Sequence, residues 1–169
     1  MPTKAVEAAI NDQVAKEFFA AHLYLSMAAW LDNQNLPGFS QWMRLQSDEE
    51  RGHAMRLFDY LLGANGSVKL QGMEEPPTTF KSPLAVMEAA FAHEKKVTAS
   101  IRKLYELAEK EKDYPTQLML QWFINEQMEE EKQAQDIIAR LKMAGDSGAA
   151  LLFLDSQMGS RGPATEGEG

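Results

Sequence analysis

The stretch Ser47–His53, S-D-E-E-R-G-H, decides the fold because it sets acids and a histidine inside an apolar helical pattern. A seam of residues spaced alternately four and three apart passes through it, as expected for a helix that packs on a partner helix. The seam consists of Phe39, Met43, Gln46, Glu50, His53, Leu57 and Tyr60. Glu50 and His53 therefore share the buried face, where a carboxylate and an imidazole can reach one metal ion.

Three other segments carry seams with the same spacing. They are Ile10, Val14, Glu17, Ala21, Tyr24, Ala28 and Leu31; Met87, Ala90, Glu94, Val97, Ile101, Leu104 and Ala108; and Leu120, Phe123, Gln127, Glu130, Ala134, Ile137 and Leu141. The sequence predicts helices over residues 3–33 and 39–63, a third from Pro83 to a break at 112–115, and a fourth from that break to about residue 144. The short link at 33–38 makes the first two helices antiparallel neighbours.

Residues 66–82 form a long connection without helical periodicity. Fully extended, it reaches about 55 Å at ~3.3 Å per residue, whereas a helix over residues 39–63 is ~38 Å long. The connection can therefore cross the length of a bundle, which leaves the third helix parallel to the second. An apolar segment at Ala149–Leu154 suggests a short fifth helix. We expect an all-α four-helix bundle over residues 1–158 and a disordered, Gly-rich tail over residues 159–169.

Each seam is apolar at its ends and polar in the middle. The polar positions are all residues that can bind a metal ion: Glu17 in the first seam, Glu50 and His53 in the second, Glu94 in the third, and Gln127 and Glu130 in the fourth. Counted from the turns between the helices, these positions agree in height within about one helical turn at ~1.5 Å per residue. All of them should therefore meet at one level of the bundle.

Four converging carboxylates need partners, because burying an ionised carboxylate costs several kcal/mol unless it is paired. No seam position is Lys or Arg, so bound cations are the most favourable partners. Oxygen ligands with one imidazole and no sulfur suit iron, manganese or zinc. Counting ligands gives two metal ions, with Glu17 and His53 on the first, Glu94 and Glu130 on the second, and Glu50 bridging them.

The composition restricts the possible partners. The chain has 169 residues, a net charge of −8 and no cysteine, which excludes disulfides, thiolate metal sites and iron–sulfur clusters. The negative charge disfavours nucleic acids and anionic membranes as partners and favours cations. No apolar run approaches the roughly 18 residues of a membrane span. The N-terminal stretch lacks the apolar region of a secretory signal, so we expect a cytoplasmic protein.

Three blocks carry a resemblance to a known family. They are Q-S-D-E-E-R-G-H (46–53), D-Y-P-T (113–116) and Q-W-F-I-N-E-Q-M-E-E-E-K (121–132), and with them the chain resembles bacterial non-haem ferritins over roughly residues 5–157. Gln127-x-x-Glu130 replaces the second Glu-x-x-His motif of bacterioferritins. Gly52 stands where a haem-ligating Met would be expected, so we expect no haem. The lack of cysteine argues against the rubredoxin-type domain of rubrerythrins.

The resemblance implies a ferroxidase that oxidises Fe(II) with O2 or H2O2 and stores ferric mineral inside a hollow cage of twenty-four subunits. It implies a redox role for Tyr24 beside the iron pair; the alternative is a core tyrosine with a bonded hydroxyl. It also implies a third iron site formed by Glu49, Glu126 and Glu129 with Glu130, for which the alternative is a solvated acidic face. We expect Trp122 to be a packing residue with a possible redox role.

Two other functions stay open from the sequence. One is a di-iron protein that detoxifies O2 or peroxide without storing iron, which would not need a cage. The other is a bundle that binds Zn or Mn for structural purposes, which would show no redox-dependent colour with Fe(II) and air.

Overall fold

A computed structural model describes residues 1–163, and in that range it contains five helices and no strands. The helices are α1 (Lys4–Asn33), α2 (Pro37–Gly63), α3 (Pro83–Lys110), α4 (Tyr114–Ala144) and α5 (Gly148–Gly159). The all-α architecture and the short fifth helix expected from the sequence are confirmed. Most of the tail predicted to be disordered, from residue 164 onwards, lies outside the described residues, while Gly159 is the last residue of α5.

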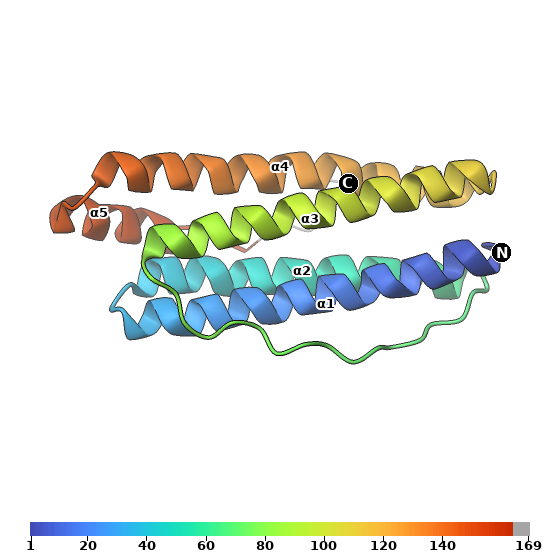
Figure 1. Cartoon of the computed structure of the whole chain (residues 1–169), viewed down its shortest axis with the longest axis horizontal. Coiled ribbons are helices and arrows are strands. Elements are labelled where there is room, and N and C mark those ends of the chain that lie inside the picture. Colours follow the sequence, from blue (N-terminus) through green and yellow to red (C-terminus); the bar gives the residue numbers. More distant parts are fainter. Residues whose placement is uncertain (164–169) are drawn as a thin grey trace.

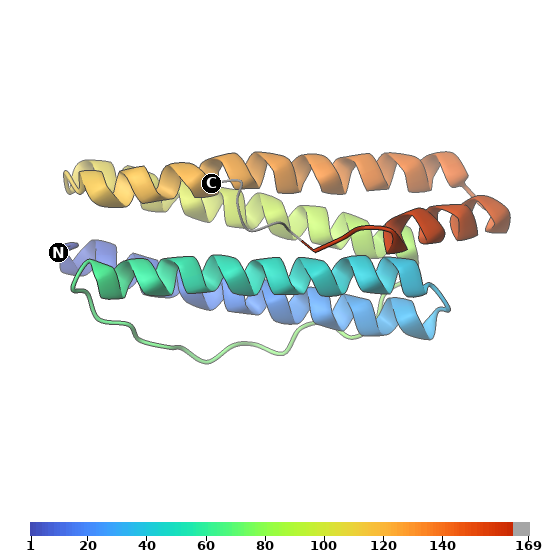
Figure 2. The same ribbon diagram turned by 180° about the vertical axis from the view of Figure 1, so that it is seen from behind.

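The four long helices form two antiparallel hairpins, α1 with α2 and α3 with α4 (Figure 1). The connection between α2 and α3 runs along the whole bundle in an extended conformation, so α3 is parallel to α2 as predicted. Figure 2 shows α5 folding back from the end of α4 at one end of the bundle, where it lies beside α2 and α4.

Local sequence signals explain where the helices begin and end. The side chains of four residues accept a hydrogen bond from the first turn of the helix that follows, as N-caps do. They are Thr3, Ser82, Asp113 and Ser147. Pro residues occupy the first turn of α2, α3 and α4, where the missing N–H has no cost.

The core consists of two hydrophobic clusters separated by a polar layer. One cluster surrounds Met27, Phe39 and Met87 at the α5 end of the bundle. The other surrounds Ile10 and Phe123 at the opposite end. The acids and the histidine in the middle of the four seams lie between the two clusters. The apolar clusters therefore fix the helix register that brings these side chains together.

The first turn of α2 depends on a contact with α5. Its N-cap residue, Leu36, offers no side-chain hydrogen bond, and Asp155 of α5 replaces it: the Phe39 N–H donates to Asp155 Oδ1 at 2.8 Å. Gly38 makes this close approach possible, because a Cβ at residue 38 would lie 1.7 Å from the carbonyl oxygen of Asp155. A carboxylate at a helix N-terminus also interacts favourably with the helix dipole. These contacts hold α5 against the start of α2.

Candidate metal centre

The polar layer of the bundle contains three overlapping groups of side chains that could each hold a cation. Within a group, one ligand atom from each residue lies within 4.8 Å of the others. The groups are Glu17, Glu50 and His53; Glu50, Glu94 and Glu130; and His53, Glu126 and Glu130. Glu50 belongs to the first two groups, which is the position that a bridging carboxylate would take. Each of the four long helices contributes at least one side chain to this centre.

Several ligand atoms of the first group have no hydrogen-bond partner among the described residues. They are Glu17 Oε2, both carboxylate oxygens of Glu50, and His53 Nδ1, and all are buried. His53 Nδ1 lies 3.3 Å from Glu50 Oε2 and 4.0 Å from Glu17 Oε2. Buried polar atoms are normally satisfied, so a group of unsatisfied atoms that face one another indicates a ligand. Oxygen-rich donors with one imidazole fit a first-row divalent cation.

Burial controls the charge of these groups. Desolvation raises the pKa of Glu17 from 4.5 to about 7, against the hydrogen bond from Gln13, which favours its ionised form. Desolvation, followed by repulsion from the neighbouring carboxylates, raises the pKa of Glu50 and of Glu130 well above the usual range. Desolvation lowers the pKa of His53 to about 4, so the ring is neutral at pH 7 and has a free lone pair. The centre without metal therefore holds protons that a cation would replace.

Glu94 is the carboxylate with the most hydrogen bonds in the layer. The Tyr24 hydroxyl donates to Glu94 Oε1 from α1, and Gln127 Nε2 donates to Glu94 Oε2 at 3.0 Å from α4. Desolvation still raises the pKa of Glu94, while these two donors lower it. Gln127 directs its amide nitrogen toward Glu94, so in this structure it holds a ligand in place.

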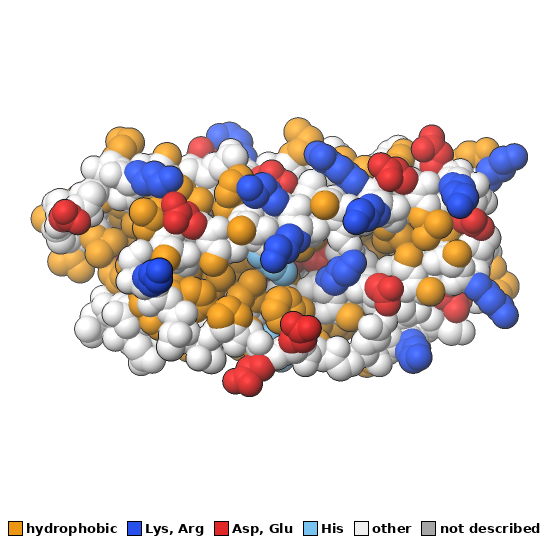
Figure 3. All heavy atoms as spheres, in the orientation of Figure 1, with side chains coloured by type: hydrophobic (Ala, Val, Ile, Leu, Met, Phe, Trp, Pro, Cys, Tyr) orange, Lys and Arg blue, Asp and Glu red, His pale blue; other side chains and the backbone are white. Residues whose placement is uncertain are grey.

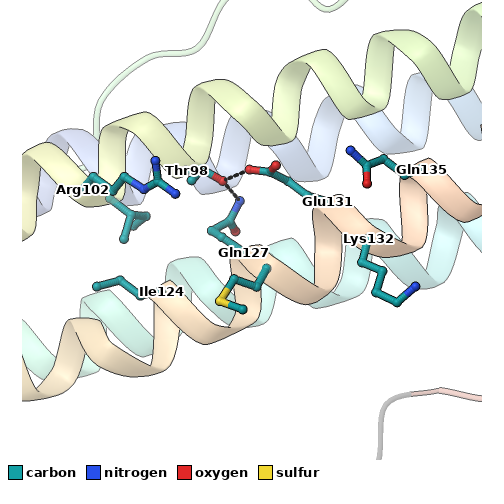
Figure 4. A pocket seen from close by; sticks show the side chains of 9 residues that line it. Thr98, Arg102, Ile124, Gln127, Glu131, Lys132 and Gln135 are labelled. Carbon is teal, nitrogen blue, oxygen red and sulfur yellow. Dashed lines mark hydrogen bonds between the residues drawn. The ribbon is translucent and has the colours of Figure 1, made fainter.

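A cavity of about 390 Å³ opens between α3 and α4 beside Gln127 (Figure 4). The Thr98 hydroxyl donates to Glu131 Oε1 at 2.6 Å and lies 3.3 Å from Gln127 Nε2. A chain of polar contacts therefore connects the surface near Glu131 with Glu94. Arg102 and Lys132 also line this cavity, so its charge is mixed.

A second chain of hydrogen bonds, which the sequence analysis did not predict, ends on Glu17. Gln13 Nε2 donates to Glu17 Oε1 at 2.7 Å, and Gln13 Oε1 accepts from the Ser100 hydroxyl at 2.6 Å. Lys16 Nζ in turn donates to Ser100 Oγ at 2.6 Å. The signal for Gln13 was present in its spacing, because a residue four positions before a seam carboxylate shares its helix face.

The three acids predicted to form a third iron site occupy different surroundings. Glu126 is half-buried, with Oε1 4.0 Å from His53 Nε2, and it joins His53 and Glu130 in the third group. Glu129 is exposed. Glu49 turns toward the C-terminal segment, where its Oε1 lies 2.6 Å from Arg161 Nη2. Among the described residues, Glu49 and Glu129 thus belong to none of the three groups.

Aromatic rings surround the centre. Trp122 packs edge-on against His53, with 5.2 Å between ring centroids, and the guanidinium carbon of Arg56 lies 4.1 Å from the centroid of its ring. His93 packs against Phe19 and against the edge of Tyr24. These contacts keep the rings in place and exclude water from one side of His53.

Comparisons with known proteins agree on one family. A family model of the ferritin-like domain matches residues 7–144. A bacterial non-heme ferritin of Bacteroides fragilis is 40% identical over 161 residues, covering 95% of this chain and all of the relative. A bacterial non-heme ferritin of Campylobacter jejuni is 38% identical and covers 92% of this chain and 93% of its own.

Two solved structures show the same arrangement of helices. One is an open-pore ferritin from the hyperthermophilic archaeon Archaeoglobus fulgidus, with a TM-score of 0.95 and 44% identity over 96% of this chain and the whole of the other. The second is a closed form of the Archaeoglobus fulgidus ferritin, engineered by site-directed mutagenesis. It has a TM-score of 0.96 and 44% identity over 97% of this chain and the whole of the other. No helix in residues 1–163 has the length and apolar character needed to cross a membrane.

Proposed function

Because this chain belongs to the ferritin-like domain family, we propose that it oxidises Fe(II) at a pair of adjacent sites inside the bundle and stores the ferric product. Iron is here the substrate and the cargo. The first iron would be held by Glu17 and His53, the second by Glu94 and Glu130, and Glu50 would bridge the two. The oxidant would be O2 or H2O2, which accepts the electrons that the Fe(II) ions lose.

The observation that carries this proposal is the position of Glu50. Its side chain is completely buried, and neither of its oxygens has a hydrogen-bond partner among the described residues. It belongs to two of the three groups of ligand atoms, the one with Glu17 and His53 and the one with Glu94 and Glu130. An ionised carboxylate in this state is strongly destabilising unless it is paired with a cation. Two cations on either side would satisfy both oxygens at once.

The donor set also favours the chemistry. Hard, anionic oxygen ligands bind Fe(III) more strongly than Fe(II), because the higher charge gains more from each carboxylate. They thereby lower the reduction potential of the bound iron and make its oxidation easier. Tyr24 would supply an electron when the oxidant needs one beyond those of the iron pair. Its proton would pass to Glu94, to which its hydroxyl already donates.

The outer acids would take iron onward from the pair. Glu126 shares His53 and Glu130 with the centre, so a third cation held by Glu126 and Glu130 would lie on the path out of the bundle. Glu49 and Glu129 would complete this site from α2 and α4. In this account, iron moves from Glu130 toward these acids after it has been oxidised.

Storage of ferric mineral requires a closed shell of subunits, and the exposed apolar surface of α5 supports assembly of such a shell. Leu152 and Phe153 are 62% and 64% exposed, and only Asp155 and Met158 of this helix are buried. Figure 3 shows hydrophobic side chains gathered at the α5 end of the molecule. Exposed apolar patches of this kind mark contacts between subunits. We therefore include in the proposal a homo-oligomeric cage of twenty-four subunits.

Stopped-flow absorbance after mixing Fe(II)-loaded protein with air tests the proposal. Glu17→Ala and His53→Ala should each abolish the fast phase of oxidation, because each removes a ligand of the first iron. Glu88→Ala is the matched control, since Glu88 is an exposed acid of α3 that pairs with Lys142 at the surface. Wild-type rates in both ligand variants would refute the iron pair. Particle size by light scattering separates a storage cage from a bundle that only detoxifies oxidants.

A further inference from the structure

The C-terminal segment returns to the metal centre after α5. Figure 2 shows the chain leaving α5 at residues 160–163 and running back beside α2. Its position follows from the docking of α5: Met158 is buried, and a Cβ at Gly159 would lie 3.1 Å from the Cα of Gly38. Arg161, two residues further on, is thereby held over the middle of α2.

The guanidinium group of Arg161 makes three contacts with α2. Its Nη2 donates to Glu49 Oε1 at 2.6 Å, and its Nη1 donates to Gln46 Oε1 at 2.7 Å. Its central carbon lies 4.9 Å from the centroid of the Trp42 ring. The side chains of Arg161 and Glu49 are only 20% and 17% exposed, so this ion pair is largely shielded from solvent. Such charge-assisted bonds are stronger than surface ion pairs.

The contact with Gln46 links Arg161 to the metal centre. Gln46 is 1% exposed, and its Nε2 donates to Glu130 Oε2. The amide thus points one end at the arginine and the other at a ligand of the second iron. Arg161 is also a positive charge near enough to favour the ionised form of Glu130.

We propose that Arg161 is an internal cation that closes the outer carboxylate site until a metal ion displaces it. The inference deepens the proposed function, since it concerns the acids that would take iron from the pair. While the guanidinium holds Glu49 Oε1, that carboxylate is engaged in the ion pair and belongs to none of the three groups of ligand atoms. A third metal ion must therefore compete with Arg161 for Glu49, and the iron pair fills before the outer site.

The geometry of the guanidinium explains why an arginine suits this role. Its two terminal nitrogens reach two acceptors at once, whereas the single amino group of a lysine cannot span Gln46 and Glu49 in the same way. Release of Arg161 would free Glu49 for the metal and Gln46 Oε1 for another donor. The exchange replaces one positive charge by another at the same carboxylate, so Glu49 keeps a cationic partner throughout.

Calorimetric titration of the full-length protein with Zn(II) tests this role without any redox step. In the wild type we expect two tight Zn(II) sites per subunit and a weaker third. Arg161→Gln should strengthen the third site roughly five- to tenfold, the size expected for loss of one shielded ion pair, and leave the pair unchanged. Arg161→Lys should give an intermediate affinity. Arg140→Gln is the control, because Arg140 is an exposed arginine of α4 without a salt bridge in residues 1–163.

A third-site affinity in Arg161→Gln equal to that of the wild type and the control would overturn the role of Arg161, as would a third site that is weakened. Melting curves of the metal-free variants check that each one folds. A different result would contradict the proposed function: a wild-type protein without two tight Zn(II) sites. The role of Arg161 is decided separately, by comparing the affinity of the third site between the variants.

Discussion

Gln13 lies one helical turn before Glu17 on α1 and holds the Glu17 carboxylate through its side-chain amide, with 2.7 Å between Nε2 and Oε1. Gln13 is 1% exposed, and its side-chain oxygen Oε1 accepts a hydrogen bond from the Ser100 hydroxyl of α3. One end of the amide is thus fixed by a neighbouring helix, and the other fixes a metal ligand. Such partners orient a ligand and adjust its basicity.

Replacing this amide should weaken the first metal site. In Gln13→Leu, Glu17 loses a hydrogen bond that favours its ionised form, so its pKa rises and a cation must displace a more firmly bound proton. A hydrogen bond to a charged group contributes about 1.5–3 kcal/mol, so Zn(II) affinity at the first site should fall roughly tenfold or more. Calorimetric titration at two pH values measures it, with the larger loss at the lower pH.

The matched control for Gln13→Leu is Gln71→Leu. Gln71 also donates to a carboxylate, Asp12 Oδ1 at 2.6 Å, but this contact is exposed and lies away from the polar layer. An equal loss of Zn(II) affinity in both variants would show that Gln13 acts on the fold rather than on Glu17.

The metal-free protein should lose stability as the pH rises above 6.5. Folding raises the pKa of Glu17 from 4.5 to about 7, so the folded state keeps a proton that the unfolded state releases, and the free energy of unfolding falls as pH rises through this window. Folding lowers the pKa of His53 and His93 from 6.5 to about 4, which has the opposite sign but ends near pH 6.5. Above pH 6.5 the carboxylate effect remains, and the raised pKa values of Glu50 and Glu130 act with the same sign as that of Glu17.

Calorimetric melting of the metal-free protein at pH 6.5 and about pH 8 checks this sign. We expect the lower melting temperature at the higher pH. Saturating Zn(II) should remove or reverse the difference, because the metal replaces the protons and binds better as they leave. A metal-free protein that melts higher at pH 8 would show that the carboxylates do not hold protons in the folded state.

Glu50→Gln should stabilise the metal-free protein while it abolishes the pair. Burial and the neighbouring carboxylates raise the pKa of Glu50, so the folded metal-free protein must keep a proton on this acid, and a neutral amide of similar size avoids that cost. Glu94→Gln should help less, because Glu94 accepts from Tyr24 and Gln127. Differential scanning calorimetry compares both with Glu88→Gln, a surface change of the same charge. A melting temperature of metal-free Glu50→Gln below that of the wild type would contradict the claim that the Glu50 acid destabilises the metal-free protein.

Glu126 and Glu129 should matter only after the first oxidation. Replacing both by Ala should spare the first turnover and slow later iron uptake, because neither belongs to the two groups that share Glu50. Of the single variants, Glu126→Ala should have the larger effect, since Glu126 faces His53 and Glu129 is exposed. Repeated additions of Fe(II) followed by absorbance separate the turnovers. Loss of the first step would place these acids in the primary site.

The helix seams explain why much of the site was predictable. Of all the positions in the four predicted seams, only Tyr60 is not buried, so a spacing of four and three was sufficient to find the inward faces. Two hairpins with short links then place mid-seam residues at one height. The fold and the convergence of Glu17, Glu50, His53 and Glu94 follow from these regularities.

The remaining features depend on contacts that no periodicity encodes. The sequence predicts a disordered tail over residues 159–169, a range that includes Arg161, because a polar, Gly-rich stretch has no apolar pattern. The place of Arg161 depends on α5 docking against Gly38, which periodicity does not encode. The direction of the Glu49 side chain depends in turn on Arg161. Gln13 does occupy the position four residues before Glu17, which is the spacing signal for a residue that supports a ligand on its own helix. The same spacing places Gln46 before Glu50, but Gln46 donates to Glu130 of α4, a contact that the spacing does not predict.

The central claim is that Glu50 bridges two iron sites inside one subunit, and anomalous diffraction at the iron edge tests it most directly. Crystals would be soaked in Fe(II) without oxygen and then exposed to air for set times. The account predicts two anomalous peaks, one among Glu17, Glu50 and His53 and one among Glu50, Glu94 and Glu130, both of which change on exposure to air. A single peak, or peaks that do not contact Glu50, would contradict it.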